Sequence, residues 1–239
     1  MSELITIRAA KKRYPNGTDV IHALGGVDFD LGEGELVAIT GRSGSGKSTL
    51  LRVAAGIEQV DDGTVTVVGT ALADATAATL AATRRHHIGV VFQQLNLLPS
   101  LTALENVALP LELDGISVKE ANVAAQVALD QVELGDRGGQ FPDQLSGGQR
   151  QRVAIARGIV GSRKILLADE PTGALDQRSG EQILSLLRAQ ADAGAGVVMV
   201  THDRALAGLA DRVVELRDGL ISSVVSRPDV ETELAELWG

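Results

Sequence analysis

The sequence predicts an α/β fold with three parts: a mostly parallel sheet, an antiparallel β sheet at its edge, and an inserted helical subdomain. Short β-rich runs alternate with helical stretches over most of the chain, which is typical of a parallel sheet with helices on both faces. Turn residues separate the runs near the amino end, as in antiparallel strands. Between Ser100 and Val160 the strand pattern disappears and helical patterns take over.

The composition is that of a globular protein, and it excludes several kinds of site. Of the 239 residues, 44% are hydrophobic and only 2% are aromatic, so the core consists mainly of aliphatic side chains. There is no Cys, which excludes disulfides, thiolate nucleophiles and Cys-ligated zinc. The net charge of −9 argues against a broad nucleic-acid surface. Nucleic acid is therefore not expected as a partner, and any phosphate site must be local.

No apolar run approaches the ~20 residues that a membrane-spanning helix needs. The first eight residues include Glu3 and no long apolar stretch, which does not fit a secretory signal peptide. We therefore expect a chain that neither crosses a bilayer nor carries a secretion signal.

Strands are expected in both sheets. The edge sheet is predicted to contain residues 5–9, 27–31 and 65–68, with turns at residues 15–17, 32–34 and 62–63. Five apolar runs predict buried strands, most of them followed by helices: residues 36–40, 88–92, 165–168, 197–201 and 213–216. The Ala-rich residues 71–82 are compatible with a helix and are interpreted as a surface connection.

The chain is expected to form a single domain, residues 1–239. Residues 1–99 and 161–225 are assigned to the α/β core with its edge sheet, and residues 100–160 to the helical subdomain. In that subdomain, Thr102 with Glu105 and Ser117 with Glu120 have the spacing of capping boxes at helix starts. Residues 226–239 are expected to form a short helix in which Trp238 is either a core anchor or a dimer contact.

A glycine-rich segment between a predicted strand and a predicted helix is the strongest local signal. It fits the phosphate-loop pattern, in which backbone N–H groups and a helix amino end face one anion. In that pattern Lys47 reaches the β and γ phosphates of a nucleotide, and Ser48 is a ligand of Mg²⁺. The alternative is a Gly-rich strand-to-helix turn that happens to contain Lys. The nine residues are Gly41, Arg42, Ser43, Gly44, Ser45, Gly46, Lys47, Ser48 and Thr49.

Two adjacent carboxylates follow the predicted strand at residues 165–168. Asp169 at the strand tip can hold Mg²⁺ through water, while Glu170 points elsewhere and can polarise an attacking water. An ordinary solvated strand end is the alternative. Together with the phosphate loop, the pair indicates phosphoryl transfer to water.

The third motif lies directly ahead of another predicted helix and consists of Leu145, Ser146, Gly147, Gly148 and Gln149. Ser146 with Gln149 fits a capping box, so a plain helix start is one interpretation. However, two adjacent glycines in a first turn cost about 1 kcal/mol each relative to Ala. This cost indicates that something approaches the backbone closely, and an anion at the helix amino end would account for both glycines.

On these motifs the sequence resembles the nucleotide-binding subunit of ATP-binding cassette transporters, whose signature is the LSGGQ pentapeptide. The resemblance covers roughly residues 4–225, and the further motifs occur in the family's order. Tyr14 matches the aromatic residue that stacks on adenine, Gln93 matches the glutamine loop, and His202 matches the switch histidine. Gln94 is the alternative at the glutamine loop, but the family pattern favours Gln93. The loop after the acidic strand, which we call the dimer loop, is matched by Ala174, Leu175 and Asp176.

The resemblance implies an ATPase that works as a dimer with ATP and Mg²⁺. Each ATP would lie between the phosphate loop of one subunit and the signature residues of a second copy or of a homologous subunit. Glu170, Gln93 and His202 would be the catalytic residues, and Mg²⁺ would be held by Ser48, Gln93 and Asp169.

The family also implies an integral membrane permease as a partner. The resemblance places its docking surface near the segment between Ser100 and Leu113, after the glutamine loop. The chain would then be cytoplasmic and peripheral on the inner face of the cell membrane.

Two segments, residues 97–107 and 170–176, resemble the ATPases of lipoprotein-releasing and macrolide-exporting systems. Arg42 stands where Pro is commoner, and Ala174 stands where this subfamily usually has Asn; neither change removes a phosphate or metal ligand. The sequence is also similar to the cell-division ATPase that signals to cell-wall hydrolases. A regulator that transmits ATP-driven motion to an extracytoplasmic hydrolase is therefore the alternative to transport.

Overall fold

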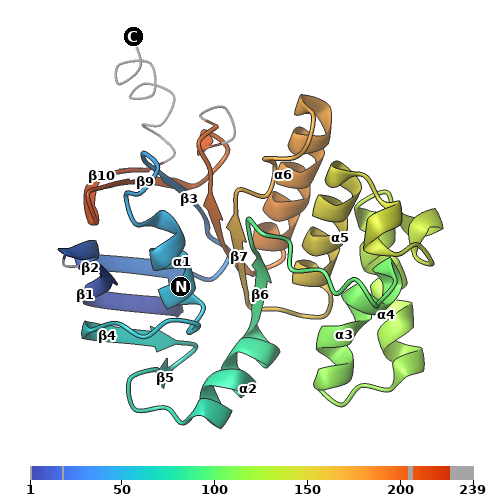
Figure 1. Cartoon of the computed structure of the whole chain (residues 1–239), viewed down its shortest axis with the longest axis horizontal. Coiled ribbons are helices and arrows are strands. Elements are labelled where there is room, and N and C mark those ends of the chain that lie inside the picture. Colours follow the sequence, from blue (N-terminus) through green and yellow to red (C-terminus); the bar gives the residue numbers. More distant parts are fainter. Residues whose placement is uncertain (1, 18, 204–206, 227–239) are drawn as a thin grey trace.

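Two sheets share one hydrophobic layer in the computed structural model, which describes residues 2–17, 19–203 and 207–226. The smaller sheet has the strand order β2-β1-β4-β5, and the larger has the order β10-β9-β3-β8-β7-β6. Helix α1 contacts both sheets, and the other long helices lie to the side of β7 and β6 (Figure 1). The predicted α/β fold, with its mostly parallel sheet, antiparallel edge sheet and inserted helical region, is confirmed.

The strands in chain order are β1 (Glu3–Asn16), β2 (Asp19–Gly32), β3 (Leu36–Thr40), β4 (Asp62–Val67), β5 (Thr70–Ala71), β6 (Ile88–Val91), β7 (Ile165–Asp169), β8 (Gly196–Val200), β9 (Arg212–Arg217) and β10 (Leu220–Ser226). The α-helices are α1 (Lys47–Ala54), α2 (Ala77–His87), α3 (Ala103–Leu113), α4 (Val118–Gln131), α5 (Gly147–Ile159) and α6 (Gln177–Asp192), and two short 3₁₀ turns are η1 (Gly135–Arg137) and η2 (Pro142–Gln144).

The central strands β3, β7 and β8 of the larger sheet are buried on both faces, which accounts for their nearly continuous apolar sequences, whereas β10 at the edge is exposed or half-buried. Strand β3 pairs in parallel with β8 and β9, and β7 pairs in parallel with β8 and β6. Successive side chains of a strand point to opposite faces. Accordingly, Val37 and Ile39 belong to the core around α1, whereas Leu36 and Ala38 belong to the core shared with α3, α5 and α6. The sheet therefore separates two cores.

Helices α3, α4 and α5 lie within residues 100–160, where the sequence predicts helices. Thr102 and Glu105 form the expected reciprocal capping box at the start of α3. Ser117 also caps α4, since its side chain accepts a hydrogen bond from the Glu120 backbone. Asn106 is fully buried, and its amide bonds to the backbone of Leu98, Leu101 and Thr102. This single side chain ties the segment before α3 to the helix.

Several element boundaries differ from the sequence prediction. Strands β1 and β2 form one long hairpin. The sequence predicted shorter strands because four register shifts interrupt the alternation of side chains along the hairpin. Residues 70–71 form β5 by pairing with β4, and α2 begins only after Thr76, whose side chain caps it. Strand β10 was not predicted. The expected helix at residues 226–239, with Trp238, lies outside the described residues except for Ser226. Over the ranges that the structure describes, no helix is both long and apolar enough to cross a bilayer.

Candidate functional site

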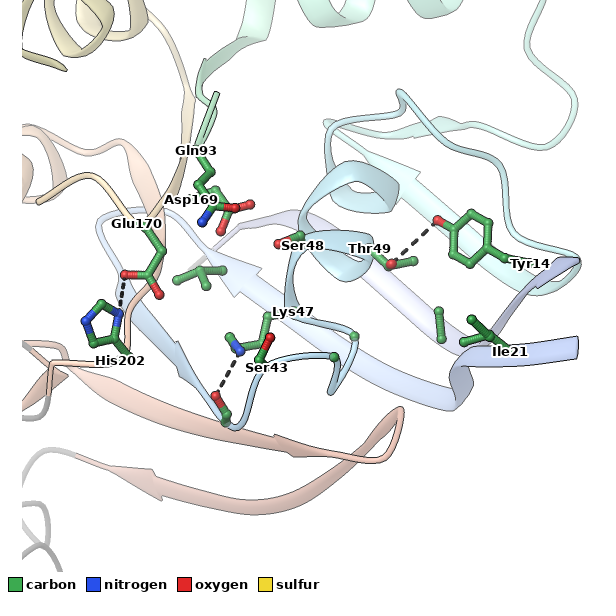
Figure 2. Close-up of a pocket in the computed structure, with 15 residues that line it drawn as sticks. Tyr14, Ile21, Ser43, Lys47, Ser48, Thr49, Gln93, Asp169, Glu170 and His202 are labelled. Carbon is green, nitrogen blue, oxygen red and sulfur yellow. Dashed lines mark hydrogen bonds and ion pairs between the residues drawn. The ribbon is translucent and has the colours of Figure 1, made fainter. Parts of the chain in front are cut away.

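The carboxyl ends of four neighbouring parallel strands bring the predicted site residues together. The glycine-rich loop follows β3, and His202 follows β8. Asp169 is the last residue of β7 and Glu170 comes directly after it, while Gln93 follows β6. These residues line one open cavity of about 470 Å³ together with Tyr14 from β1. Figure 2 shows their side chains around α1 and the loop before it. Sequence segments that lie far apart thus meet because of the strand order β3-β8-β7-β6.

The loop before α1 approaches the rest of the fold so closely that two of its glycines cannot be replaced without strain. Gly41 has a φ of +137°, and a Cβ there would lie 2.1 Å from the carbonyl oxygen of Leu216 in β9. Gly46 has a φ of +104°, and a Cβ there would lie 2.3 Å from the carbonyl oxygen of Ala23 in β2. The loop is therefore held between the two sheets, and only glycine fits at these points.

The same loop presents donors for an anion. Helix α1 starts at Lys47, and Gly46 at its N-cap has no side chain to bond the first-turn N–H groups. The ammonium group of Lys47 donates to the carbonyl oxygens of Gly41 and Arg42, at 2.8 and 2.9 Å, and so lies inside the curl of the loop. Ser45 is buried, and its hydroxyl oxygen has no hydrogen-bond partner among the described residues. These features fit the phosphates of a nucleotide.

Asp169 and Glu170 leave β7 in different directions. Asp169 is buried at the end of the strand and lies beside Gln93 and Ser48 (Figure 2). Glu170 has a φ of +52°, an uncommon conformation for a residue with a side chain, and its N–H donates to the carbonyl oxygen of Val200. This turn aims the Glu170 carboxylate toward His202 and away from Asp169. The two acids therefore occupy two separate positions, as the sequence predicts.

Glu170 and His202 form an ion pair across the ends of β7 and β8. The Nδ1 atom of His202 lies 2.8 Å from Oε2 of Glu170 (Figure 2). The contact with Glu170 is the main cause that raises the pKa of His202, while partial burial opposes it. The His202 side chain is 77% exposed, so this edge of the site is open to solvent. The sequence motifs place both residues at the site, but not their contact.

Tyr14 lies at the other end of the cavity, with Ile21, Ala23 and Thr49 nearby. It faces Ile21 across the β1–β2 hairpin. Its hydroxyl donates to Oε2 of Glu58 at 2.6 Å and lies 3.5 Å from the Thr49 hydroxyl. Burial and the Glu58 bond raise the pKa of Tyr14. Sequence reasoning found Tyr14 but not Ile21, Ala23 or Glu58, because a strand pairing and a turn, rather than a motif, bring them there.

The oxygen donors near the loop suit a hard cation. The hydroxyl of Ser48, the carboxylate of Asp169 and the amide of Gln93 lie on three elements that converge on the same part of the cavity (Figure 2). Carboxylates, together with substrate phosphates and waters, are the usual ligands of Mg²⁺ in nucleotide sites. The donor set therefore fits a magnesium ion that arrives with a nucleotide.

The remaining predicted residues form a second, separate surface. Ser146 and Gln149 make a reciprocal capping box at the start of α5, and Leu145 before them is buried. Ser146, Gly148 and Gln149 line a cavity of about 440 Å³ together with the dimer loop, Ala174, Leu175 and Asp176. Among the residues that the structure describes, none lines both this cavity and the one at the phosphate loop. Each chain thus presents two distinct surfaces.

Arg152 holds the two parts of this second surface together, and the sequence analysis missed it. From α5, its guanidinium donates to Glu133 and to the side chains of Ser179 and Gln182 on α6. Asp176 caps α6 by accepting from the backbone and hydroxyl of Ser179, and these bonds lower the pKa of Asp176. The signature residues and the dimer loop are consequently fixed to one another.

Comparison with known proteins agrees with this arrangement. A family model described as ABC transporter matches residues 24–173, a stretch that contains the phosphate loop, the signature residues and both acids. Among curated proteins, the chain is 43% identical over 231 residues to the macrolide export ATP-binding/permease protein MacB 1 of Escherichia coli O1:K1 / APEC. That match covers 97% of this chain and 35% of the relative. The chain therefore spans about a third of the length of the curated relatives it matches.

Two solved structures are similar over nearly their whole length. A dimeric structure of MJ0796, described as a bacterial ABC transporter cassette, has a TM-score of 0.90 and 41% identity, and covers 93% of this chain and 98% of that chain. A dimeric post-hydrolysis state of the same cassette, bound to ADP and Pi, has a TM-score of 0.89 and 40% identity, with the same coverage.

The pKa of His202 should depend on Glu170. In the unsubstituted protein we expect it above the usual value of about 6.5, and in Glu170→Gln it should return toward that value. An NMR pH titration of the imidazole signals measures both, with His202→Ala to identify the signal and Glu3→Gln, which changes a carboxylate at the start of β1, as the control. Because the pKa of His202 is raised in the folded protein, its ion pair with Glu170 contributes fully to the free energy of unfolding below about pH 6.5. This contribution is lost as the pH rises through the folded-state pKa of His202. An unchanged His202 pKa in Glu170→Gln would contradict the ion pair.

Proposed function

This chain is an ATP-binding cassette ATPase of the ABC transporter family, and we propose that it forms one domain that hydrolyses ATP in sites shared between two subunits. The second subunit is another copy of the chain or a homologous ATPase. The observation that carries the proposal is the separation of the phosphate-loop cavity from the signature cavity on a single chain. Since none of the described residues lines both cavities, a site that uses both needs two chains.

At the phosphate loop, the chain binds the triphosphate. The N–H groups of the loop and of the start of α1 face the phosphates, Lys47 neutralises the β and γ phosphates, and Thr49 lies further along α1. Residues 41–49 therefore form the phosphate half of the site. Ser48, Gln93 and Asp169 would hold Mg²⁺, which supplies charge neutralisation at the phosphate oxygens.

Glu170 is proposed as the residue that activates the attacking water. Its carboxylate lies at the proposed γ-phosphate end of the cavity. The backbone N–H of Glu170 donates to the Val200 carbonyl, and the carboxylate contacts His202, so both the backbone and the side chain are held in place. Glu170 accepts a proton from the water as the water oxygen attacks the γ-phosphorus, and the bond between that phosphorus and the bridging oxygen of the β-phosphate breaks, which gives ADP and inorganic phosphate. His202 orients Glu170 before the reaction, and once charged it is also a donor for the γ-phosphate. Gln93 positions the water from the end of β6.

The adenine is proposed to stack on Tyr14, at the opposite end of the cavity from His202. The aromatic ring, Ile21 and Ala23 supply an apolar surface there, and Thr49 borders it from α1. The base, ribose and phosphates of ATP would therefore follow one another along the cavity from Tyr14 to Glu170.

The signature residues Leu145, Ser146, Gly147, Gly148 and Gln149 are proposed to close the site of the other subunit. Ser146 and Gly147 are exposed, and α5 begins with Gly147, so its amino end can face a γ-phosphate held by the partner. Ala174, Leu175 and Asp176 lie beside them and would contact the same partner. ATP then joins the two subunits, and hydrolysis separates them because the bridging γ-phosphate is gone.

The ATPase is proposed to drive an integral membrane permease of the macrolide-export or lipoprotein-release type. The relative from Escherichia coli is named as a macrolide export ATP-binding/permease protein, and this combination of ATP binding with a permease supports a membrane partner here. The chain would then be cytoplasmic and peripheral on the inner face of the membrane. The same name gives no support to the alternative, a cell-division regulator that does not transport.

A groove between the core and the helical subdomain is the proposed docking surface for the permease. It has a volume of about 270 Å³, and its lining combines apolar side chains with arginines: Arg85, Ile88, Gly89, Val90, Phe92, Asn96, Pro110, Arg157 and Arg163. Pro110 belongs to the segment between Ser100 and Leu113 that the sequence indicates. Arg157 on α5 donates to the carbonyls of Leu95 and Asn96, just after Gln93. This connects the groove to the nucleotide site.

Mixing two inactive variants should restore activity. Gly148→Asp puts a carboxylate against the partner's γ-phosphate, while Lys47→Ala abolishes triphosphate binding at its own loop, so each protein alone should be inactive. In a heterodimer, one site keeps both an intact Lys47 and an intact signature. Random pairing of equal amounts makes half of the dimers mixed, each with one of two sites intact, so about a quarter of the unsubstituted ATPase rate is expected.

The double variant Lys47→Ala, Gly148→Asp is the matched control, since mixing it with Gly148→Asp leaves no intact site. Asp at the start of α5 is compatible with the helix dipole, so the fold of this variant should persist. Activity in the first mixture that does not exceed the sum of the separate variants would contradict the shared site.

A negative charge beside the groove should uncouple the permease without affecting hydrolysis. Leu113 at the end of α3 is 62% exposed, and Val127 on α4 is a matched exposed apolar residue at 54%. Leu113→Glu should keep the basal ATPase rate and lose most of the stimulation measured in vesicles that carry the permease, whereas Val127→Glu should keep both. Glu105 is unsuitable for this test, because its carboxylate caps α3. Equal stimulation of both variants would remove the end of α3 from the docking surface.

A further inference from the structure

We infer that Glu58 is a positioning residue for the nucleotide base, which acts by holding the ring of Tyr14 through the tyrosine hydroxyl. The inference rests on the proposed function, in which Tyr14 stacks on adenine. Glu58 itself borders a neighbouring cavity of about 150 Å³, together with Gln59, Val65 and Leu72. Its contribution to nucleotide binding therefore passes through Tyr14.

The bond between the two side chains is short and charge-assisted. The Tyr14 hydroxyl donates to Oε2 of Glu58 at 2.6 Å, and both side chains are partly buried. Burial and this bond raise the pKa of Tyr14, so the hydroxyl remains a proton donor at neutral pH. The same hydroxyl lies 3.5 Å from that of Thr49, which belongs to the helix that follows the phosphate loop. The hydroxyl end of the Tyr14 ring therefore lies next to α1.

Lys12 holds the other oxygen of Glu58 and also contacts the ring. Its ammonium group lies 3.7 Å from Oε1 of Glu58 and 3.5 Å from Oδ1 of Asp61, and it donates to the carbonyl of Gln59 at 2.8 Å. The same group lies over the Tyr14 ring, 5.7 Å from its centroid, within the range of a cation–π contact. Tyr14 is therefore held both at its hydroxyl and over its ring.

The backbone around Glu58 is anchored on β1, so the carboxylate is a fixed point. The backbone N–H of Glu58 donates to the carbonyl of Arg52 at the end of α1. Three residues later, the Asp61 N–H donates to the carbonyl of Lys11, and the Asp61 carboxylate accepts from the Arg13 N–H at 2.7 Å. Residues 58–61 are consequently held against the strand that carries Tyr14.

A fixed ring matters because Tyr14 lies near the tip of a hairpin that is partly open to solvent. Ile21, which pairs with Tyr14, and Val20, which pairs with Pro15, are both half exposed, so this end of the hairpin is open to solvent. Without the hydroxyl bond, the ring would have to be ordered each time a base binds, and that entropy would be lost from the affinity. With it, the stacking surface exists before the nucleotide arrives.

Removing either partner of the bond should weaken ATP binding to the same extent and leave triphosphate binding unchanged. Glu58→Ala and Tyr14→Phe should each bind ATP about fivefold to tenfold more weakly, the net scale of one ordinary hydrogen bond, because the bond orders the ring and does not contact the nucleotide itself. The double variant should bind no more weakly than either single variant, because both remove one interaction. Glu58→Gln, which keeps an acceptor, should recover part of the affinity. Isothermal titration calorimetry in EDTA measures binding of ATP and of inorganic tripolyphosphate.

Two controls separate this inference from the proposed function. Glu3→Ala removes a carboxylate from the same strand, where Glu3 accepts from the Thr6 hydroxyl, and should bind both probes normally. Tyr14→Ala tests the stacking itself: if it does not weaken ATP binding, the base site in the proposed function is wrong and the inference falls with it. If Tyr14→Ala weakens ATP binding but Glu58→Ala does not, the inference alone is overturned. Equal weakening of ATP and tripolyphosphate by Glu58→Ala would also overturn it, since Glu58 would then act on the loop.

Discussion

The parallel pairing of β3, β8, β7 and β6 is the constraint on which the nucleotide site depends. In a parallel sheet all carboxyl ends lie at one edge, so Gln93, Glu170 and His202 are brought beside the phosphate loop although they are far apart in the sequence. The aliphatic interiors of these strands are buried on both faces, and that burial holds the register. A shift of one residue in any strand would turn its terminal polar side chain away from the cavity.

A second constraint fixes the loop itself. Gly41 lies against the Leu216 carbonyl of the larger sheet, and Gly46 lies against the Ala23 carbonyl of the smaller sheet, in each case closer than a side chain would allow. The phosphate loop is thus held between both sheets by close backbone contacts. By contrast, the signature residues and the dimer loop lie at a separate cavity and are tied to each other through Arg152 and α6. The chain therefore carries two separate surfaces, and each is held in place by its own contacts.

The sequence predicted two parts of the site: the strand, loop and helix at residues 36–54, and the acidic end of β7. Both could be predicted because hydrophobic periodicity and short motifs involve residues that are close in the sequence. The extent of β1 and β2 was not predictable, since register shifts break the alternation, and β10 was missed because Ser222 and Ser223 interrupt its apolar pattern. The contacts of Glu170 with His202 and of Tyr14 with Glu58 join distant segments, and no local pattern encodes them. The roles of the site residues stay predictions.

The association state of Glu170→Gln with ATP tests the central claim most directly. This variant should bind ATP without hydrolysing it, so the γ-phosphate that joins two subunits persists. Size exclusion with light scattering should give the mass of one chain without nucleotide and about twice that mass with ATP and Mg²⁺, while adding Gly148→Asp should abolish the shift. A Glu170→Gln protein that is saturated with ATP yet keeps the mass of a single chain at micromolar concentration would contradict the shared site.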